Sequence, residues 1–63
     1  MEQIIKDEIN KRISKFIEYE LLKNLIMNRG FSKDEVMDGI HGYLESGLLE
    51  VKLVADIVCI KLK

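Results

Sequence analysis

The first half of the chain spaces its apolar residues in the manner of amphipathic helices. From Glu2 to Arg29 almost every residue is an acceptable helix former, and apolar residues recur at helical spacing. At 100° per residue they form two stripes on nearly opposite sides of one projected helix. The first stripe comprises Ile5, Ile9, Ile13 and Phe16, and the second comprises Leu22, Leu25, Ile26 and Arg29.

A bend or turn near residues 17–20 would let both stripes meet one core. We therefore predict two helices, over about 2–16 and 19–29. Gly30 would end the second helix, where Arg29 suits the negative end of the helix dipole. Because no glycine or proline marks the join between the two helices, one continuous helix packed on both sides, as in a dimer, stays open as an alternative.

The next stretch predicts a third helix over about 33–46, with a signal at each end. Ser32 is a favourable N-cap and Glu35 follows three residues later, so the pair can form a capping box. Glycine at position 47 can adopt the left-handed conformation that ends a helix. The apolar face of this helix comprises Val36, Met37, Ile40, Tyr43 and Leu44.

The last part of the chain is rich in β-formers. Leu49, Val51 and Leu53 alternate with charged residues, and a second apolar run follows the pair Ala55-Asp56. We predict an antiparallel hairpin with strands over about 48–54 and 57–62 and its turn at Ala55-Asp56. An edge this apolar could also pair with another chain.

These elements predict one α+β, mainly α, domain over residues 1–63, with three helices followed by a C-terminal antiparallel hairpin. At the junction of the third helix and the first strand, apolar residues and a glycine are spaced as in a winged helix-turn-helix domain of the small type found in archaea, their viruses and bacteria. The residues that carry this resemblance are Val36, Ile40, Tyr43, Leu44, Gly47, Leu48 and Leu49.

The resemblance implies that the second and third helices form the helix-turn-helix pair, with Gly30 in the turn. The pair Ala55-Asp56 would be the tip of the wing. In DNA-binding members the third helix enters the major groove and the wing touches the backbone or the minor groove. The resemblance therefore implies a DNA-binding protein, most simply a transcription regulator that binds double-stranded DNA.

Basic residues that could contact nucleic acid are spread over the predicted elements. They are Lys11, Arg12, Lys15, Arg29, Lys33, His41 and Lys52. The third helix itself argues against DNA, because between Ser32 and Gly47 one lysine stands against four carboxylates, a net charge of -3. Carboxylates that face phosphates are repelled, and only an occasional hydrogen bond from a cytosine amine favours one.

The alternative function is protein interaction, as an accessory subunit of a replication, transcription or other macromolecular assembly. Its acidic third helix would dock on a basic or apolar surface of a larger protein. Gly39 and Gly42, three residues apart on this helix, could form a strip where another backbone approaches closely. The candidate partner-binding residues are Asp34, Asp38, Gly39, Gly42 and Glu45.

Length and composition support a small globular domain. The chain has 63 residues, of which 48% are hydrophobic and 33% charged, and its formal net charge is -1. A domain of this size buries only about 60% of the surface of its unfolded chain. Extra burial would stabilise it, and two sites would raise affinity for a palindromic target, so we expect a homodimer through the first helix or the last strand.

The cysteine count and the hydropathy pattern indicate the compartment. Cys59 is the only cysteine, so an intrachain disulfide and a cysteine zinc cluster are excluded, and we expect a buried thiol on a strand. Charged residues interrupt the N-terminal apolar positions, and no run reaches the about 20 residues that span a bilayer. We expect a cytoplasmic protein with no membrane contact. The chain has no proline and is rich in isoleucine, lysine and glutamate, a composition typical of proteins from heat-loving microbes.

The sequence offers little for catalysis. His41 is the only histidine, and no serine or cysteine is spaced to act as its nucleophile. Asp34 and Asp38 lie one turn apart and could loosely hold a cation, but solvated carboxylates are the simpler interpretation. The chain is also too small to wall off a substrate pocket of several hundred Å³. We predict a non-enzymatic protein with no metal, no cofactor and no small-molecule substrate.

Overall fold

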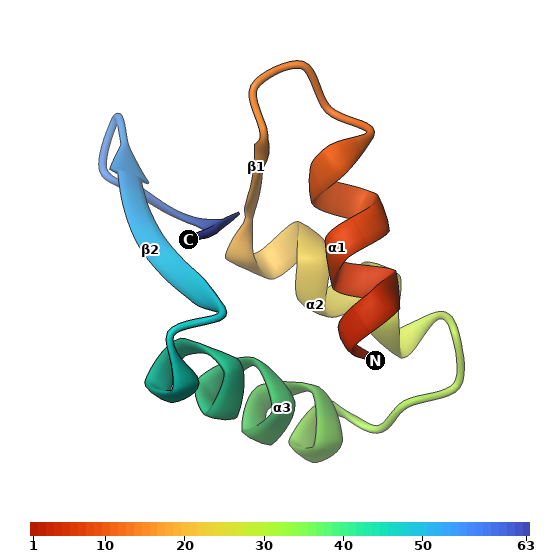
Figure 1. Ribbon diagram of the computed structural model, residues 1–63. Coiled ribbons are helices and arrows are strands. Elements are labelled where there is room, and N and C mark those ends of the chain that lie inside the picture. The colour runs from red at the N-terminus through yellow and green to blue at the C-terminus, as the bar shows by residue number, and fades with distance from the viewer.

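The structure, a computed structural model that describes residues 1–63, contains three helices and a three-stranded antiparallel sheet (Figure 1). In chain order the elements are α1 (Glu2–Asn10), β1 (Phe16–Glu18), α2 (Tyr19–Met27), α3 (Lys33–Ser46), β2 (Leu49–Val54) and β3 (Ile57–Leu62). The predicted fold, three helices followed by a C-terminal hairpin, is wrong because a strand lies between the first two helices and joins the sheet. The fold is α+β, with strand order β1-β3-β2.

The segment after α1 is where the sequence was misread. The helix ends at Asn10, well before the expected bound at residue 16, and turns over residues 11–15 end with Lys15 at a positive φ of 62°. Ile13, expected on the apolar stripe, is fully exposed, whereas Ile17 is buried in β1. Helix propensities of ordinary residues differ by less than about 1 kcal/mol, so burial and strand pairing outweigh them here. The alternative of one continuous helix is excluded as well, because β1 separates α1 from α2.

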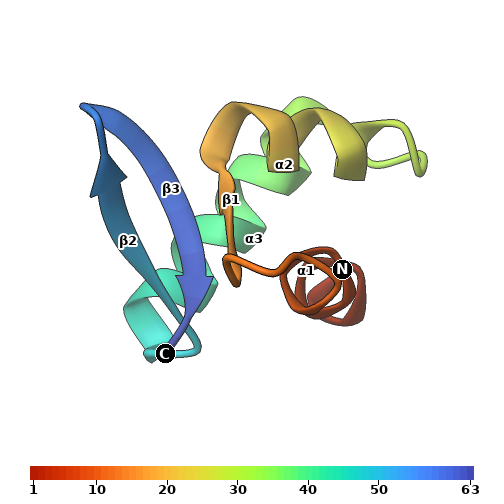
Figure 2. The same ribbon diagram turned by 90° about the horizontal axis from the view of Figure 1, so that it is seen from above.

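β3 is the central strand of the sheet. Ile60 lies opposite Ile17 of β1 on one side and opposite Val51 of β2 on the other. Figure 2 shows β2, β3 and β1 side by side, with α1 and α2 beyond β1. β2 pairs with the whole of β3 and β1 with its residues 59–61, so the last strand has no continuous free edge for a second chain. The free edges of the sheet belong to β1 and β2.

The hairpin turn at Ala55-Asp56 is confirmed. Both residues have positive φ, 51° for Ala55 and 67° for Asp56. Two successive residues in this conformation are the mark of a type I′ turn, whose twist matches that of the strands it joins. The turn fixes the register of β2 against β3, so that Val54 pairs with Ile57 and Leu49 with Leu62.

The expected ends of the third helix are confirmed as well. The Ser32 hydroxyl accepts a hydrogen bond from the Glu35 backbone N–H at 3.2 Å, and the Ser32 N–H donates to the Glu35 carboxylate at 2.9 Å. This reciprocal pair is the predicted capping box. At the other end Gly47 has φ 86°, the left-handed conformation that lets the chain leave α3 and enter β2.

Acidification is expected to weaken this capping box. The hydrogen bonds from Ser32, mainly that of its backbone N–H, hold the pKa of Glu35 below its ordinary value. A carboxylate with a depressed folded-state pKa stabilises the fold above its unfolded pKa of about 4.3. That contribution is lost as the pH falls through the depressed folded value.

The variant Glu35→Gln tests this pH dependence, since glutamine keeps the capping hydrogen bond but does not titrate. We expect its free energy of unfolding to fall less steeply with acid below about pH 4.5 than that of the unchanged chain. Urea unfolding followed by circular dichroism at a series of pH values measures both slopes. Equal slopes would show that Glu35 contributes nothing to the acid response.

Every helix and strand contributes to one hydrophobic core. It comprises nine buried residues: Ile5, Ile9, Ile17, Leu22, Ile26, Val36, Ile40, Leu49 and Ile60. Cys59 is also buried on its strand, as expected, but outside this cluster. The hairpin supplies only Leu49 and Ile60 to the core, so most of its apolar side chains lie elsewhere.

Candidate functional site

An open groove of about 490 Å³ lies between α3, the start of α2 and the hairpin. Six of the nine residues that line it are hydrophobic. It is open to solvent along the hairpin, unlike an enclosed substrate pocket, because several of its apolar residues are themselves exposed. The lining residues are Glu18, Tyr19, Glu20, His41, Leu44, Val51, Ile57, Val58 and Ile60.

The alternation of the strands places these apolar side chains. Leu49, Val51 and Leu53 lie on one face of β2, the face that packs on the helices. Their exposed fractions rise along the strand, from 2% for Leu49 to 52% for Val51 and 67% for Leu53. The core therefore continues outward as an exposed apolar surface where the hairpin extends beyond α3.

Two carboxylates line the groove and two more lie on the helix face that carries His41. Glu18 and Glu20 line the groove directly, and Glu20 pairs with Lys23 at 2.7 Å. On α3, Asp38 and Glu45 lie about one turn before and one turn after His41, and therefore on the same helix face. Both side chains are exposed. In its ion pair with Lys23 the side chain of Glu20 stays 70% exposed, so its carboxylate remains accessible to an incoming cation.

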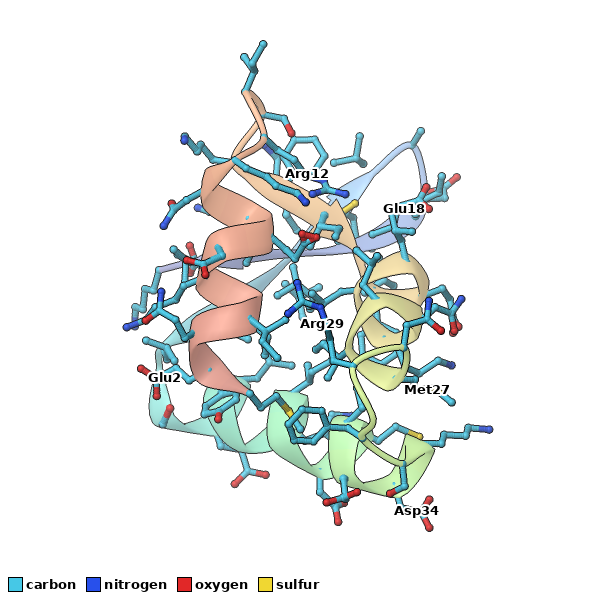
Figure 3. All side chains as sticks on the ribbon, turned by 90° about the vertical axis from the view of Figure 1, so that its right-hand side faces the viewer. Glu2, Arg12, Glu18, Met27, Arg29 and Asp34 are labelled. Atoms are coloured by element: carbon cyan, nitrogen blue, oxygen red, sulfur yellow. The ribbon has the colours of Figure 1, made fainter.

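The basic residues selected from the sequence are not gathered into one patch. The side chain of Arg12 lies near the end of α1, that of Arg29 extends back between α1 and α2 in this view, and Asp34 marks the distant start of α3 (Figure 3). Lys33 begins α3, and His41 lines the groove. Lys52 lies on the other face of the hairpin, its Nζ 4.9 Å from the centre of the Phe16 ring.

The three basic residues of the loop between α1 and β1 are held by local contacts. Lys11 pairs with the buried carboxylate of Glu8 at 2.5 Å, and the Arg12 guanidinium donates to the Glu8 carbonyl oxygen at 2.8 Å. Lys15 donates to the carbonyl oxygen of Asn10. These contacts close the end of α1, and this loop is the one place where three of the selected basic residues lie close together in the chain.

The acidic residues of the candidate partner-binding set, and one of its two glycines, face solvent. Asp34, Asp38, Gly42 and Glu45 are exposed, and a Cβ added at Gly42 would meet nothing within 4 Å. Gly39 is different, because a Cβ there would overlap the sulfur of Met1. The glycine thus makes room for the start of α1, and the two glycines do not form one continuous open strip.

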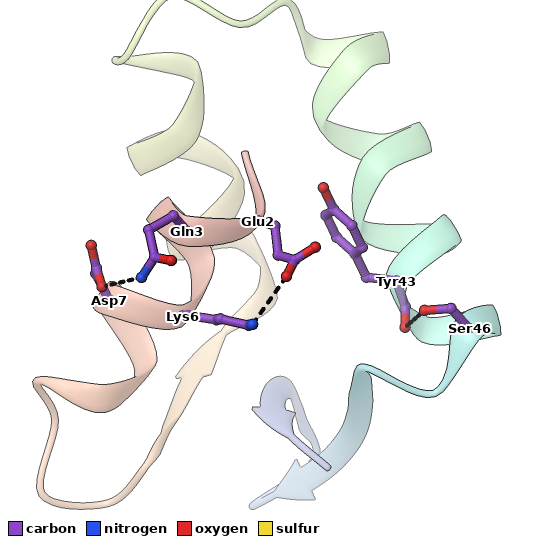
Figure 4. Close-up of polar contacts among 6 residues, drawn as sticks. All are labelled: Glu2, Gln3, Lys6, Asp7, Tyr43 and Ser46. Atoms are coloured by element: carbon purple, nitrogen blue, oxygen red, sulfur yellow. Dashed lines mark hydrogen bonds and ion pairs between the residues drawn. The ribbon is translucent and has the colours of Figure 1, made fainter.

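The start of α1 covers the middle of α3. Figure 4 shows Glu2, with its ion-pair partner Lys6 at 3.0 Å, and Tyr43 in the region between these two helices. Met1 and Tyr43 both pack against the core. This contact separates the covered side of α3, which includes Gly39, from its groove side, which includes His41 and Leu44.

Several lining residues of the groove were missed in the sequence, above all Tyr19, Val51, Ile57 and Val58. The signal was present in the second strand of the hairpin, where Ile57 and Val58 are adjacent. Neighbouring residues of a strand point to opposite faces, so both faces of β3 carry apolar side chains at this point. With helices on only one face, some of that apolar surface has to be exposed.

Comparisons with protein families, with curated proteins and with solved structures gave no match to this chain. No helix has the length and apolar character needed to cross a membrane. No three histidine, cysteine, aspartate or glutamate side chains lie close enough together to hold a metal ion. The groove combines a mainly apolar lining with the two carboxylates Glu18 and Glu20.

Proposed function

We propose that this chain is a non-enzymatic protein-binding domain, an accessory subunit that docks a segment of a larger protein in the groove between α3 and the hairpin. The supporting observation is the exposed apolar lining, in which Val51 and Val58 are each about half exposed. Burying apolar surface contributes about 25 cal/mol per Å², so a partner that covers this lining gains affinity from it. The acidic face of α3 supports the same proposal.

The charges around the groove define the chemistry of the partner segment. Glu18 and Glu20 line the groove, Asp38 and Glu45 share the helix face of His41, and like-charge contacts across an interface cost several kcal/mol. A segment with apolar side chains on one face and lysine or arginine on the other meets both requirements. An amphipathic helix of this kind docks by inserting its apolar face into a hydrophobic groove.

A labelled synthetic peptide of about 14 residues, built from leucine and lysine as an amphipathic helix, tests this proposal. Its matched control carries glutamate in place of every lysine. We expect the lysine peptide to bind at least about tenfold more tightly, as measured by fluorescence anisotropy. The variant Val58→Ser should weaken binding several-fold. Ile13→Ser also replaces a β-branched apolar side chain by serine, but at an exposed residue outside the groove, and should not weaken binding. Equal binding of both peptides, or an unaffected Val58→Ser variant, would overturn the proposal.

A second candidate is a DNA-binding transcription regulator. It is favoured by the consecutive helices α2 and α3, joined by a turn with Gly30 at φ 105° and followed by the hairpin, the order on which the winged-helix resemblance rests. The loop with Lys11, Arg12 and Lys15 would supply phosphate contacts. In contrast, α3 would present carboxylates to DNA, so we place this candidate second.

Titration of labelled duplex DNA at low and at moderate salt separates the two candidates. A regulator would bind at low salt and lose affinity steeply as salt rises, because phosphate contacts release counterions. Replacing Lys11, Arg12 and Lys15 together by alanine would then weaken binding and flatten its salt dependence. Absence of binding at low salt would reject this candidate.

A further inference from the structure

The edge of the sheet formed by β2 has no partner within the chain. β2 spans six residues and pairs only with β3, whereas β1, at the opposite edge, has only three residues. On this strand Val51 is about half exposed and Leu53 is 67% exposed. A long, apolar and unpaired edge is a template for pairing with another strand.

The register of the hairpin identifies the backbone groups that face outward. The Lys63 N–H donates to the Leu48 carbonyl oxygen, and in an antiparallel ladder every second residue makes such bonds to the same neighbour. Glu50, Lys52 and Val54 therefore direct their N–H and C=O groups toward β3. Leu49, Val51 and Leu53 direct theirs away from the sheet.

A second copy of the chain can pair with this edge in few registers. Residues whose backbone N–H and C=O groups face outward have to lie opposite residues of the same kind on the second copy. The two-fold axis that relates the copies is perpendicular to the sheet, and this rule places it at Glu50, Val51 or Lys52. An axis at Glu50 would place the two Glu50 side chains opposite each other, and an axis at Lys52 would do the same with the two lysines. Both pairings bring like charges together and are repulsive. An axis at Val51 places Glu50 opposite the partner's Lys52, and by symmetry Lys52 opposite the partner's Glu50.

The register centred on Val51 also matches the apolar face. Val51 then lies opposite its own symmetry copy, and Leu49 lies opposite the partner's Leu53, so the most exposed leucine of the hairpin gains an apolar neighbour. Glu50 is free to take part, because its pairing with Lys61 at 2.8 Å leaves 43% of its side chain exposed. Charge and hydrophobicity therefore select the same register.

We propose that two copies of this chain associate through antiparallel pairing of β2 with β2, centred on Val51, to form a continuous six-stranded sheet. The interface is isologous, since the same surface is used by both copies. The helix-bearing faces of the two copies lie on the same side of the combined sheet. This inference does not require the proposed function, because it is argued from the backbone edge and charges of β2, although Val51 belongs both to that edge and to the groove lining.

Charge reversal tests the register. Lys52→Glu sets two glutamates against two glutamates, and Glu50→Lys sets lysines against lysines, so each variant alone should self-associate about tenfold more weakly than the unchanged chain. An equimolar mixture of the two variants should regain association, because every pair across the interface is then attractive. Lys33→Glu, the same charge change at the start of α3, is the matched control and should leave association unchanged.

Analytical ultracentrifugation over a range of concentrations measures these affinities. Amide hydrogen exchange gives a second readout, since the N–H groups of Leu49, Val51 and Leu53 should become protected as concentration rises. Those of Glu50 and Lys52 are bonded within the chain and should not change. A chain that stays monomeric, a mixture that fails to regain association, or protection that does not depend on concentration would each overturn the proposal.

Discussion

Replacing Ile60 by alanine is expected to lower the free energy of unfolding by about 2–5 kcal/mol. Ile60 is fully buried in the central strand, where it faces Ile17 on one side and Val51 on the other. Truncation removes apolar contacts and leaves a cavity between two neighbouring strands. A domain of this size has a total stability of only about 3–9 kcal/mol, so this single change can leave much of the protein unfolded.

Urea unfolding followed by circular dichroism measures the loss, with Val58→Ala as the matched control. Val58 lies two residues away on the same face of β3 but is about half exposed, so its truncation should cost less than about 1 kcal/mol. The dependence on urea should stay the same in both variants, because the surface exposed on unfolding changes little. Similar losses at the two positions would contradict the central place of β3 in the core.

The parts of the fold that the sequence predicted are those with local signals. The capping box needs only Ser32 and Glu35, three residues apart, and the end of α3 needs only Gly47. The turn at Ala55-Asp56 followed from two alternating apolar runs on either side of it. Each of these features depends on residues close together in the sequence, so periodicity and capping rules suffice to find it.

The part that the sequence did not predict depends on contacts between distant residues. β1 has three residues, too few to show an alternating pattern, and its only partner is β3 at the other end of the chain. Without that partner, residues 11–16 resemble an extension of α1. The groove was missed for a related reason, since Tyr19 and His41 meet Val58 only after the sheet has formed.

The same segment carries the second large prediction, the replacement of Ile17 by aspartate. Ile17 is 2% exposed, within a core made only of apolar side chains. The change removes a buried isoleucine and introduces a carboxylate among the apolar side chains of the core, while the nearby guanidinium of Arg12 is held by the carbonyl oxygen of Glu8. Burial of an unpaired charge is among the few mechanisms that cost more than about 4 kcal/mol, so we expect the variant to be largely unfolded.

Ile13→Asp is the matched control, with the same chemical change four residues earlier. Ile13 is fully exposed in the loop after α1, so this variant should stay within about 0.5 kcal/mol of the unchanged chain. A helix that continued to residue 16 would give a different result, because Ile13 would then share the buried stripe of Ile5 and Ile9. Urea midpoints of the two variants therefore decide between a strand and a helix in this segment. A large loss of stability in Ile13→Asp with a small loss in Ile17→Asp would support the helix and contradict the presence of β1 in the sheet.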